Sequence, residues 1–211
     1  MVDQSMEFTK TLASCFEERF TELGGEIVGS DNYINGDPDF SAQIDRFLND
    51  DGDSEFLFFS SVPNDAGPLV LQFRDKGVTL PIVSGDGFDT PLVAEVAGDQ
   101  AYDVYISTHC SYTNEAENVQ NFVKAYTEAY GTAPENAFAA LGYDAMDLIG
   151  KALEKVEDPT DTAAIRDAIE STKDFKGVTG TISYTADSHK PDKTASILEL
   201  VDGQFQFITE E

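Results

Sequence analysis

Short apolar runs alternate with amphipathic segments through the first half of this sequence, and this alternation constrains the fold more than any other feature. Residues 56–62 are nearly continuous in apolar side chains, which is typical of a strand buried on both faces. The pattern predicts four strands, at residues 26–29, 56–62, 80–83 and 102–107. Strands that alternate with helices form parallel sheets covered by helices on both faces. We therefore predict an α/β fold built on a doubly wound parallel sheet.

Amphipathic helices are expected around these strands. An apolar residue recurs at every fourth position from Phe8 to Phe20, which predicts a helix over residues 6–23. Three more helices are expected in this half. Asp39 and Thr90 are the expected N-caps of two of them, and Pro68 is expected in the first turn of the third.

The second half of the chain has a different pattern. Three helices are expected, over residues 118–130, over residues 134–155 and from Asp161 onward. Three strands follow at residues 181–184, 196–201 and 204–208, and Asp202-Gly203 between the last two is a strong hairpin signal. A purely doubly wound domain does not close with antiparallel strands, so we expect this tail to belong to a second lobe.

The charge of the chain excludes some partners. Forty acidic residues against 13 basic ones give a formal net charge of -27. A field of that sign repels phosphate, so nucleic acid and anionic membrane surfaces are poor partners. No apolar run approaches the roughly 20 residues of a membrane span, and residues 1–5 do not resemble a signal peptide. If the protein is exported, we expect its export signal to be absent from this chain.

Residues that carry chemistry are sparse. Cys15 and Cys110 are the only cysteines, without a CxxC pair, so a zinc cluster is excluded and a mutual disulfide is unsupported. His109 and His189 lack metal-ligand spacing, and there is no GxSxG motif. The acidic run at 49–53 lacks the spacing of a calcium loop and indicates a solvated turn. We expect no enzymatic activity, no metal and no cofactor; a dinucleotide fold is only weakly supported because Gly85-Asp86-Gly87 lacks a third glycine.

The strand ends are the most informative positions. Ser60, Ser61, Val62 and Asn64 follow one predicted strand, and Ser84 and Asp86 follow the next. The carboxyl ends of neighbouring parallel strands meet at one edge, where helix N-termini also point. Hydroxyls and backbone N–H groups there suit a carboxylate, and the carboxylate of Asp86 suits an ammonium. This edge is therefore a candidate site for a zwitterion such as an amino acid, unless Asp86 is simply a turn residue.

Several blocks of sequence occur in a recognisable order across nearly the whole chain. They are Phe16-Glu17-Glu18-Arg19-Phe20, Leu23-Gly24-Gly25-Glu26-Ile27-Val28, Gly36-Asp37-Pro38-Asp39-Phe40-Ser41, Gly85-Asp86-Gly87, Phe138-Ala139-Ala140-Leu141-Gly142-Tyr143-Asp144-Ala145 and Gly177-Val178-Thr179-Gly180. Together they resemble the leucine/isoleucine/valine-type (type I) periplasmic solute-binding proteins of amino-acid ABC importers. The resemblance implies two α/β lobes that clamp an amino acid or a similar small zwitterion or amide, delivery to an ABC permease, and no catalysis.

The same resemblance implies which residues bind the ligand. In the family pattern an acidic residue at the position of Asp86 holds the ammonium. Phe8 stands where an aromatic residue commonly precedes a Ser or Thr, and Phe138 falls near another ring of the cleft. Ser61, Val62 and Asn64 lie in a segment that usually includes tyrosines. The absence of tyrosines there implies a different side-chain pocket.

The resemblance also implies a C-terminal portion of a longer protein. Residues 1–133 correspond to the second α/β lobe, and residues 134–211 to helices and terminal strands that return in part to the first lobe. We expect the full-length form to be a periplasmic or extracellular lipoprotein. We also expect this chain to form a homodimer through apolar surface that would otherwise meet the first lobe. The alternative is the ligand-sensing domain of a receptor or regulator with the same bilobed fold.

Overall fold

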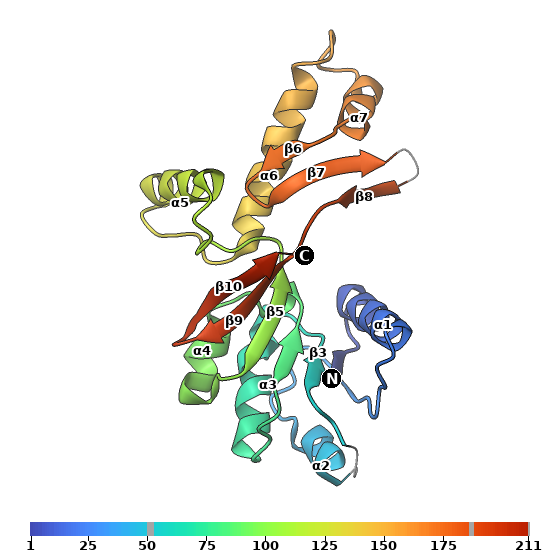
Figure 1. Cartoon of the computed structure of the whole chain (residues 1–211), viewed down its shortest axis with the longest axis vertical. Helices are drawn as coiled ribbons and strands as arrows, with labels where there is room; N and C mark the ends of the chain where they lie inside the picture. The colour runs from blue at the N-terminus through green and yellow to red at the C-terminus, as the bar shows by residue number, and fades with distance from the viewer. Residues whose placement is uncertain (50–52, 186–187, 211) are drawn as a thin grey trace. The chain divides into compact units, whose positions relative to one another are not determined.

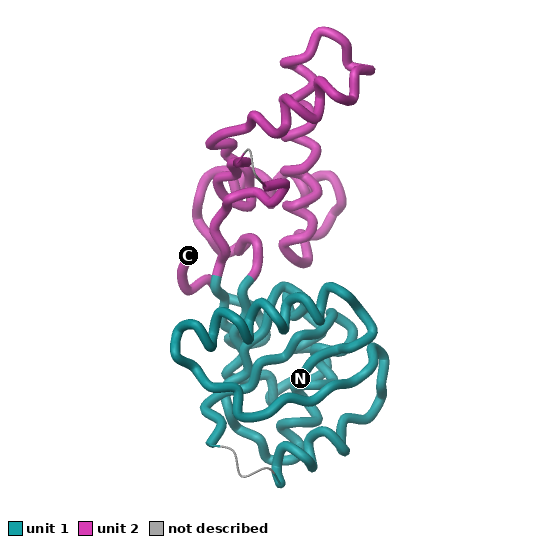
Figure 2. The backbone as a smooth tube through the Cα atoms, turned by 90° about the vertical axis from the view of Figure 1, so that its right-hand side faces the viewer, with its two compact units in different colours: residues 1–107, 197–206 teal, residues 108–196, 207–211 magenta. Residues whose placement is uncertain are grey.

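The computed structural model describes residues 1–49, 53–185 and 188–210 and divides the chain into two compact units. Unit 1 consists of Met1–Ser107 and Ile197–Gln206, and unit 2 of Thr108–Ser196 and Phe207–Glu211 (Figure 2). The lobe boundary between residues 133 and 134 that the sequence led us to expect concerns the intact protein, and it stays a prediction.

Unit 1 is built on a parallel sheet. Strands β3 (Leu57–Phe59), β4 (Ile82–Ser84) and β5 (Val104–Thr108) pair in parallel in that order. The hairpin of β9 (Ser196–Val201) and β10 (Gln204–Glu210) extends the sheet beyond β5 (Figure 1). These elements confirm the predicted α/β fold. The tail that we expected to belong to a second lobe is divided: residues 134–196 lie in unit 2, but residues 197–206 of the hairpin lie in unit 1, because they continue its sheet beyond β5.

The fourth predicted strand, at residues 26–29, is wrong. Residues 25–31 have no regular secondary structure, and a two-residue strand, β2 (Asn32–Tyr33), forms just after them. It pairs in parallel with β1 (Val2–Asp3), which also bridges to Ser60 at the end of β3. Among the described residues, no strand lies beside residues 26–29 with which they could form a ladder.

Helices pack on both faces of this sheet, because alternate residues of a strand point to opposite sides. Leu57 and Phe59 lie in a buried core with side chains from three helices, α2 (Ser41–Asn49), α3 (Pro63–Asp75) and α4 (Leu92–Ala97). Phe58 points to the other face, where Phe16 of α1 (Glu7–Glu22) stacks on it with ring centroids 3.8 Å apart.

Two predicted helix starts shift. Helix α3 begins at Pro63, so Pro68 lies inside the helix and not in its first turn. In unit 2, the helix expected from residue 134 begins at Ala137, because the side chain of Asn136 accepts a hydrogen bond from the Phe138 N–H and caps the helix.

Unit 1 also contains two short 3-10 turns. The first, η1 (Asp86–Phe88), follows β4, and the second, η2 (Gly98–Gln100), follows α4.

Unit 2 contains three helices and a small sheet among its described residues. The helices are α5 (Glu117–Tyr130), α6 (Ala137–Leu153) and α7 (Thr162–Glu170), which Asp161 caps as expected. The sheet has the order β6 (Phe175–Gly177), β7 (Gly180–Thr185) and β8 (Ser188–Asp192), and its strands are antiparallel. Only β7 was predicted; β6 has only three residues and β8 is polar, and their pairing with β7 defines them.

Candidate functional site

Five of the six candidate residues lie in unit 1, around the carboxyl edge of its parallel strands. Ser61 and Val62 follow β3, Asn64 is the second residue of α3, and Asp86 is the first residue of η1 after β4. Phe8 lies in the first turn of α1. We call this set (Phe8, Ser61, Val62, Asn64 and Asp86) the binding edge.

The two loops of the binding edge are in direct contact. A Cβ atom built on Gly87 would lie 1.9 Å from the carbonyl oxygen of Ser61 and 3.5 Å from the Cα of Val62. Only a glycine permits this approach of the two backbones. Asp86, the neighbour of Gly87, is thereby held beside the end of β3.

Asp86 lies in a tight turn with its side chain partly accessible. The Phe88 N–H donates to the Gly85 carbonyl at 3.0 Å, and the Asp89 N–H donates to the Asp86 carbonyl at 3.0 Å. A Cβ on Gly85 would lie 2.8 Å from a methyl carbon of Leu12, so α1 packs directly over this turn. The Asp86 backbone is therefore fixed by its own turn and by the helix above it.

The start of α1 is tied to the same edge through Thr9. Its hydroxyl is fully buried and donates to the Asp3 carbonyl at 2.7 Å, and the Ser60 hydroxyl donates to the Thr9 carbonyl at 2.6 Å. Phe8, one residue earlier, remains 45% exposed. The buried threonine thus anchors the helix, and the exposed phenylalanine ring is available for an apolar contact.

The serine hydroxyls near the binding edge donate to backbone oxygens, and a ligand contact of Ser61 stays a prediction. Ser60 donates to Thr9, the Ser84 hydroxyl donates to the Phe59 carbonyl at 2.7 Å, and the Ser61 hydroxyl donates to the Val62 carbonyl at 3.0 Å. All three protons are committed to backbone oxygens. Helix α3 begins at Pro63, next to Asn64, and backbone N–H groups at a helix N-terminus suit a carboxylate.

Phe138 belongs to unit 2. It is the second residue of α6 and is 40% exposed. Its membership of a common site with the binding edge stays a prediction.

Two buried carboxylates behind the binding edge were missed by the sequence analysis. Asp3 Oδ1 accepts hydrogen bonds from the N–H and the hydroxyl of Ser5 at 2.8 and 2.5 Å. The Asp65 carboxylate, in the first turn of α3, accepts from the Asn35 side chain at 3.0 Å and from the Gly36 N–H at 3.1 Å. These bonds hold the turn after β2 against the start of α3 and so support the binding edge.

Burial perturbs the ionisable groups of this support. It raises the pKa of Asp65 above its ordinary value, against the opposing effect of the hydrogen bond from Gly36. It also raises the pKa of Tyr33, whose hydroxyl faces Ser61 and Asp65. The only sequence signal for this network was an acidic residue in a helix turn directly after a buried strand, which is common in purely structural positions.

Other chemistry is not indicated in the described parts of the chain. Residues 1–49, 53–185 and 188–210 contain no group of three or more His, Cys, Asp or Glu side chains that could hold a metal ion. The acidic run at 49–53 lies largely outside these ranges. Neither cysteine forms a disulfide; Cys15 is exposed and Cys110 is buried. In the same ranges no helix is sufficiently long and apolar to span a membrane.

Comparison with known proteins shows the family of the chain. The sequence profile of the periplasmic binding proteins matches residues 1–204, and the chain therefore belongs to that family. Among curated relatives, the Leu/Ile/Val-binding protein homolog 3 of Brucella melitensis biotype 1 is 23% identical over 199 residues, which is 93% of this chain and 52% of that protein. The chain spans about half the length of the curated relatives it matches over most of its own length.

Solved structures indicate the same type of binding protein. The chain is similar to the leucine-binding protein LivK of Thermotoga maritima, with a TM-score of 0.89 and 27% identity over 99% of this chain and 58% of that one. It is also similar to the branched-chain amino-acid binding protein LivJ of Streptococcus pneumoniae, solved with isoleucine, with a TM-score of 0.83 and 31% identity over 99% of this chain and 57% of that one. These neighbours confirm the leucine/isoleucine/valine-type resemblance and the fold class.

Proposed function

We propose that this chain is part of the extracytoplasmic solute-binding component of an ABC importer and that its binding edge receives an amino acid or a similar small zwitterion or amide. The observation that carries the proposal is the contact of Gly87 with the Ser61 carbonyl, which fixes Asp86 beside the start of α3. A carboxylate and a helix N-terminus are then adjacent, and these are the two groups that a zwitterion requires.

In this proposal four residues of the binding edge are assigned to parts of the ligand. Asp86 accepts hydrogen bonds from the ligand ammonium, and the backbone N–H groups beside Asn64 receive its carboxylate or another acceptor. Phe8 and Val62 contact the ligand side chain, for which their apolar surface suits aliphatic groups. Phe138 of unit 2 is proposed as a further apolar contact. The bound isoleucine of the LivJ structure supports a ligand of this class.

The wider setting is proposed from the family. We expect the intact protein to be periplasmic or extracellular, to be anchored as a lipoprotein, and to deliver its ligand to a membrane permease without catalysing a reaction. Residues 1–133 are assigned to its second lobe, and residues 134–211 to segments that return in part to the first. The family to which the chain belongs is one of binding proteins, which supports these assignments.

Titration with isoleucine tests the proposal. Backbone amide signals of Gly85, Gly87 and Asn64 are followed by nuclear magnetic resonance in the wild-type chain and in Asp86→Asn. We expect isoleucine to shift these signals in the wild type and the shifts to vanish in Asp86→Asn. Asp99→Asn is the matched control, because Asp99 is an exposed carboxylate in η2 of the same unit. Wild-type signals that stay unchanged at saturating isoleucine would contradict the proposal.

A further inference from the structure

Two buried oxygen atoms behind the binding edge have no hydrogen-bond partner among the described residues. They are Oδ2 of Asp3 and the hydroxyl oxygen of Tyr33. Asp3 is fully buried, and Tyr33 is 3% exposed. They end two short strands that pair with each other, since Asp3 of β1 is the register partner of Tyr33 of β2. Buried polar atoms are nearly always bound to protein, to water or to an ion, so this pair of oxygens is a candidate set of ligands.

The same region holds a second buried carboxylate, that of Asp65, which is 3% exposed. One residue joins the two carboxylates: the Asn35 N–H donates to Asp3 Oδ1 at 3.2 Å, and the Asn35 side chain donates to Asp65 Oδ2 at 3.0 Å. The two carboxylates are close enough to repel each other electrostatically. In the described part of the chain, neither forms an ion pair with a Lys, Arg or His side chain. Two buried negative charges without a positive partner are costly.

The Tyr33 side chain is directed at this pair of carboxylates. Its hydroxyl faces Asp65 and Ser61, with Asp3 close by. Its ring packs edge-on against Phe40 in the core, with centroids 5.2 Å apart and an interplanar angle of 84°. The core thus holds the ring while the hydroxyl oxygen keeps lone pairs for a ligand.

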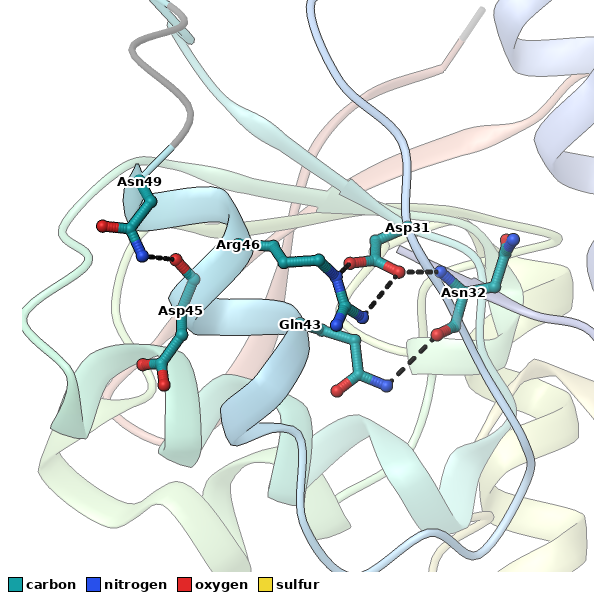
Figure 3. A network of polar contacts seen from close by, with 6 residues as sticks. All are labelled: Asp31, Asn32, Gln43, Asp45, Arg46 and Asn49. Atoms are coloured by element: carbon teal, nitrogen blue, oxygen red, sulfur yellow. Dashed lines mark hydrogen bonds and ion pairs between the residues drawn. The ribbon is translucent and has the colours of Figure 1, made fainter.

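Helix α2 fixes the strand that carries Tyr33 (Figure 3). The guanidinium of Arg46 donates to both carboxylate oxygens of Asp31, at 2.6 and 3.1 Å. The side chain of Gln43 donates to the Asn32 carbonyl at 3.2 Å. Asp31 and Asn32 directly precede Tyr33, so its backbone is held in place. Ligand atoms on a fixed backbone lose little freedom on binding, which favours binding.

Hydrogen bonds already use much of the acceptor capacity of the two carboxylates. Asp3 Oδ1 accepts from the N–H and the hydroxyl of Ser5 and from the Asn35 N–H. Both oxygens of Asp65 accept, from the Asn35 side chain and from the Gly36 N–H. All of these donors are neutral, so they stabilise the carboxylates without cancelling their charge. Positive charge is therefore the property that a ligand of this region must supply.

The oxygen atoms that can still meet a cation are few. They are Asp3 Oδ2, a remaining lone pair of the Asp65 carboxylate, the Tyr33 oxygen, and the oxygen of the Ser61 hydroxyl, which donates its proton to the Val62 carbonyl. Oxygen ligands suit hard cations, but Ca²⁺ takes about six to eight of them and Mg²⁺ requires an octahedral set. The smaller set suits a monovalent alkali cation. The net charge of -27 also raises the local concentration of cations.

We propose that Asp3, Tyr33, Asp65 and Ser61 bind one monovalent alkali cation at the carboxyl ends of β1, β2 and β3, beside the first turn of α3. The ion compensates the charge of the two carboxylates. It also ties the turn after β2 to the binding edge through Ser61. The site lies behind the binding edge and is independent of the proposed amino-acid ligand.

Sodium titration tests this proposal. NaCl replaces choline chloride at constant ionic strength, so that screening is unchanged. The amide signals of Ser5, Asn35 and Gly36 are followed by nuclear magnetic resonance, because these N–H groups donate to the two carboxylates. We expect saturable shifts of all three signals. We also expect a melting temperature at least about 2 °C higher in saturating NaCl than in choline chloride, since the ion binds the folded chain.

Parallel titrations with KCl and CaCl₂ identify the ion. Saturable shifts with potassium in place of sodium would support the same site for the larger alkali ion. Saturation by CaCl₂ at a lower concentration than by either alkali salt would contradict the assignment, because it requires more oxygen ligands than the site offers. The absence of a saturable shift with sodium and with potassium would overturn the proposal, and water or a proton would then meet these oxygens.

Two variants with matched controls separate a bound ion from a general effect of salt. Tyr33→Phe removes a ligand oxygen that has no hydrogen-bond partner among the described residues, so the protein should fold and its Kd for sodium should rise at least about tenfold. Asp3→Asn removes a ligand charge and should abolish the saturable shift at Gly36. The controls are Tyr130→Phe, at a side chain 70% exposed, and Asp99→Asn in η2, and both should keep the wild-type Kd. A wild-type Kd in Tyr33→Phe would contradict the proposal.

Discussion

Gly87 lies against the carbonyl oxygen of Ser61 so closely that a Cβ atom on Gly87 would be 1.9 Å from it. Both partners of this contact are backbone, so a side chain cannot rotate away to make room. The contact joins the loops after β3 and β4 and determines where Asp86 stands.

Gly87→Ala should therefore destabilise unit 1 by about 3 kcal/mol, at the upper end of what overpacking usually costs. The two loops must separate to admit the methyl group. Urea unfolding followed by circular dichroism measures the change. Gly29→Ala is the control, because a Cβ on Gly29 meets no atom within 4 Å, and its stability should stay within about 0.5 kcal/mol of the wild type. Equal stability of the two variants would show that the loops yield easily.

Asp144 stabilises unit 2 as a buried hydrogen-bond acceptor. Its buried carboxylate accepts hydrogen bonds from the Val178 N–H at 2.7 Å, the Thr179 N–H at 2.8 Å and the Thr179 hydroxyl at 2.7 Å. Asp144→Asn replaces one acceptor oxygen with an NH₂ group that faces donors, and it should cost about 3 kcal/mol. Asp147→Asn, on an exposed position of the same helix, should cost less than about 0.5 kcal/mol. Thermal unfolding of both variants checks this, and a small effect of Asp144→Asn would contradict the assigned role.

The buried amino group of Met1 should make stability depend on pH. Its pKa is about 6 in the folded protein against 8.0 ordinarily, so between these values the unfolded chain binds more protons. Folding stability then rises with pH from about 6 to about 8, by up to about 2.7 kcal/mol for two pKa units. The measurement is urea unfolding across this range, compared with the Nα-acetylated protein, in which this contribution is absent. Identical pH profiles of the two proteins would contradict the burial of a charged nitrogen.

Helix α6 presents an apolar face that predicts self-association. Tyr143 and Met146 are 53% and 68% exposed, and Ile149 and Leu153 continue the same exposed face. We expect a homodimer through this face, strengthened by salt because two chains of net charge -27 repel each other. Met146→Lys should weaken dimerisation at least tenfold in sedimentation experiments, whereas Thr21→Lys, an exposed position on α1, should leave it unchanged. A wild-type monomer at high concentration and high salt would contradict this prediction.

The sequence predicted the elements whose signals are local. The strands beginning at Leu57, Ile82 and Val104 follow from apolar runs, and Asp161 caps its helix as expected. The strand at residues 26–29 failed because a strand needs a neighbour, and no pattern within a segment reports whether one exists. Pairing with β7 likewise defines β6 and β8.

The sequence predicted the location of the candidate site but not the directions of its side chains. The location of Asp86 at the strand edge follows from topology, since parallel strands end at a common edge. The direction of a hydroxyl does not follow from topology, and the Ser60 and Ser84 protons point to backbone oxygens. The close approach of Gly87 to Ser61 brings together residues 26 positions apart, and only the folded backbone reveals it.

The affinity of this chain for amino acids should be weak. An ion pair between the ligand ammonium and a solvent-accessible carboxylate such as Asp86 contributes about 0–1 kcal/mol, while immobilising a free ligand costs at least about 4 kcal/mol. Contacts at the binding edge alone should therefore give a Kd no tighter than about 1 mM, or about -4 kcal/mol. In a protein with the full length of the relatives, where more polypeptide is available to enclose the ligand, Asp86→Ala should weaken binding by at least about 2 kcal/mol, because it leaves a buried ammonium unpaired.

Isothermal titration calorimetry with isoleucine checks both parts of this prediction. A micromolar Kd for the 211-residue chain would show that the binding edge does not act alone and that this chain already encloses its ligand. Unchanged affinity of the full-length Asp86→Ala variant would remove Asp86 from the site, because a carboxylate that holds the ammonium cannot be deleted without loss. Asp99→Ala in the same protein is the control, since Asp99 lies exposed in η2, and its affinity should equal that of the wild type.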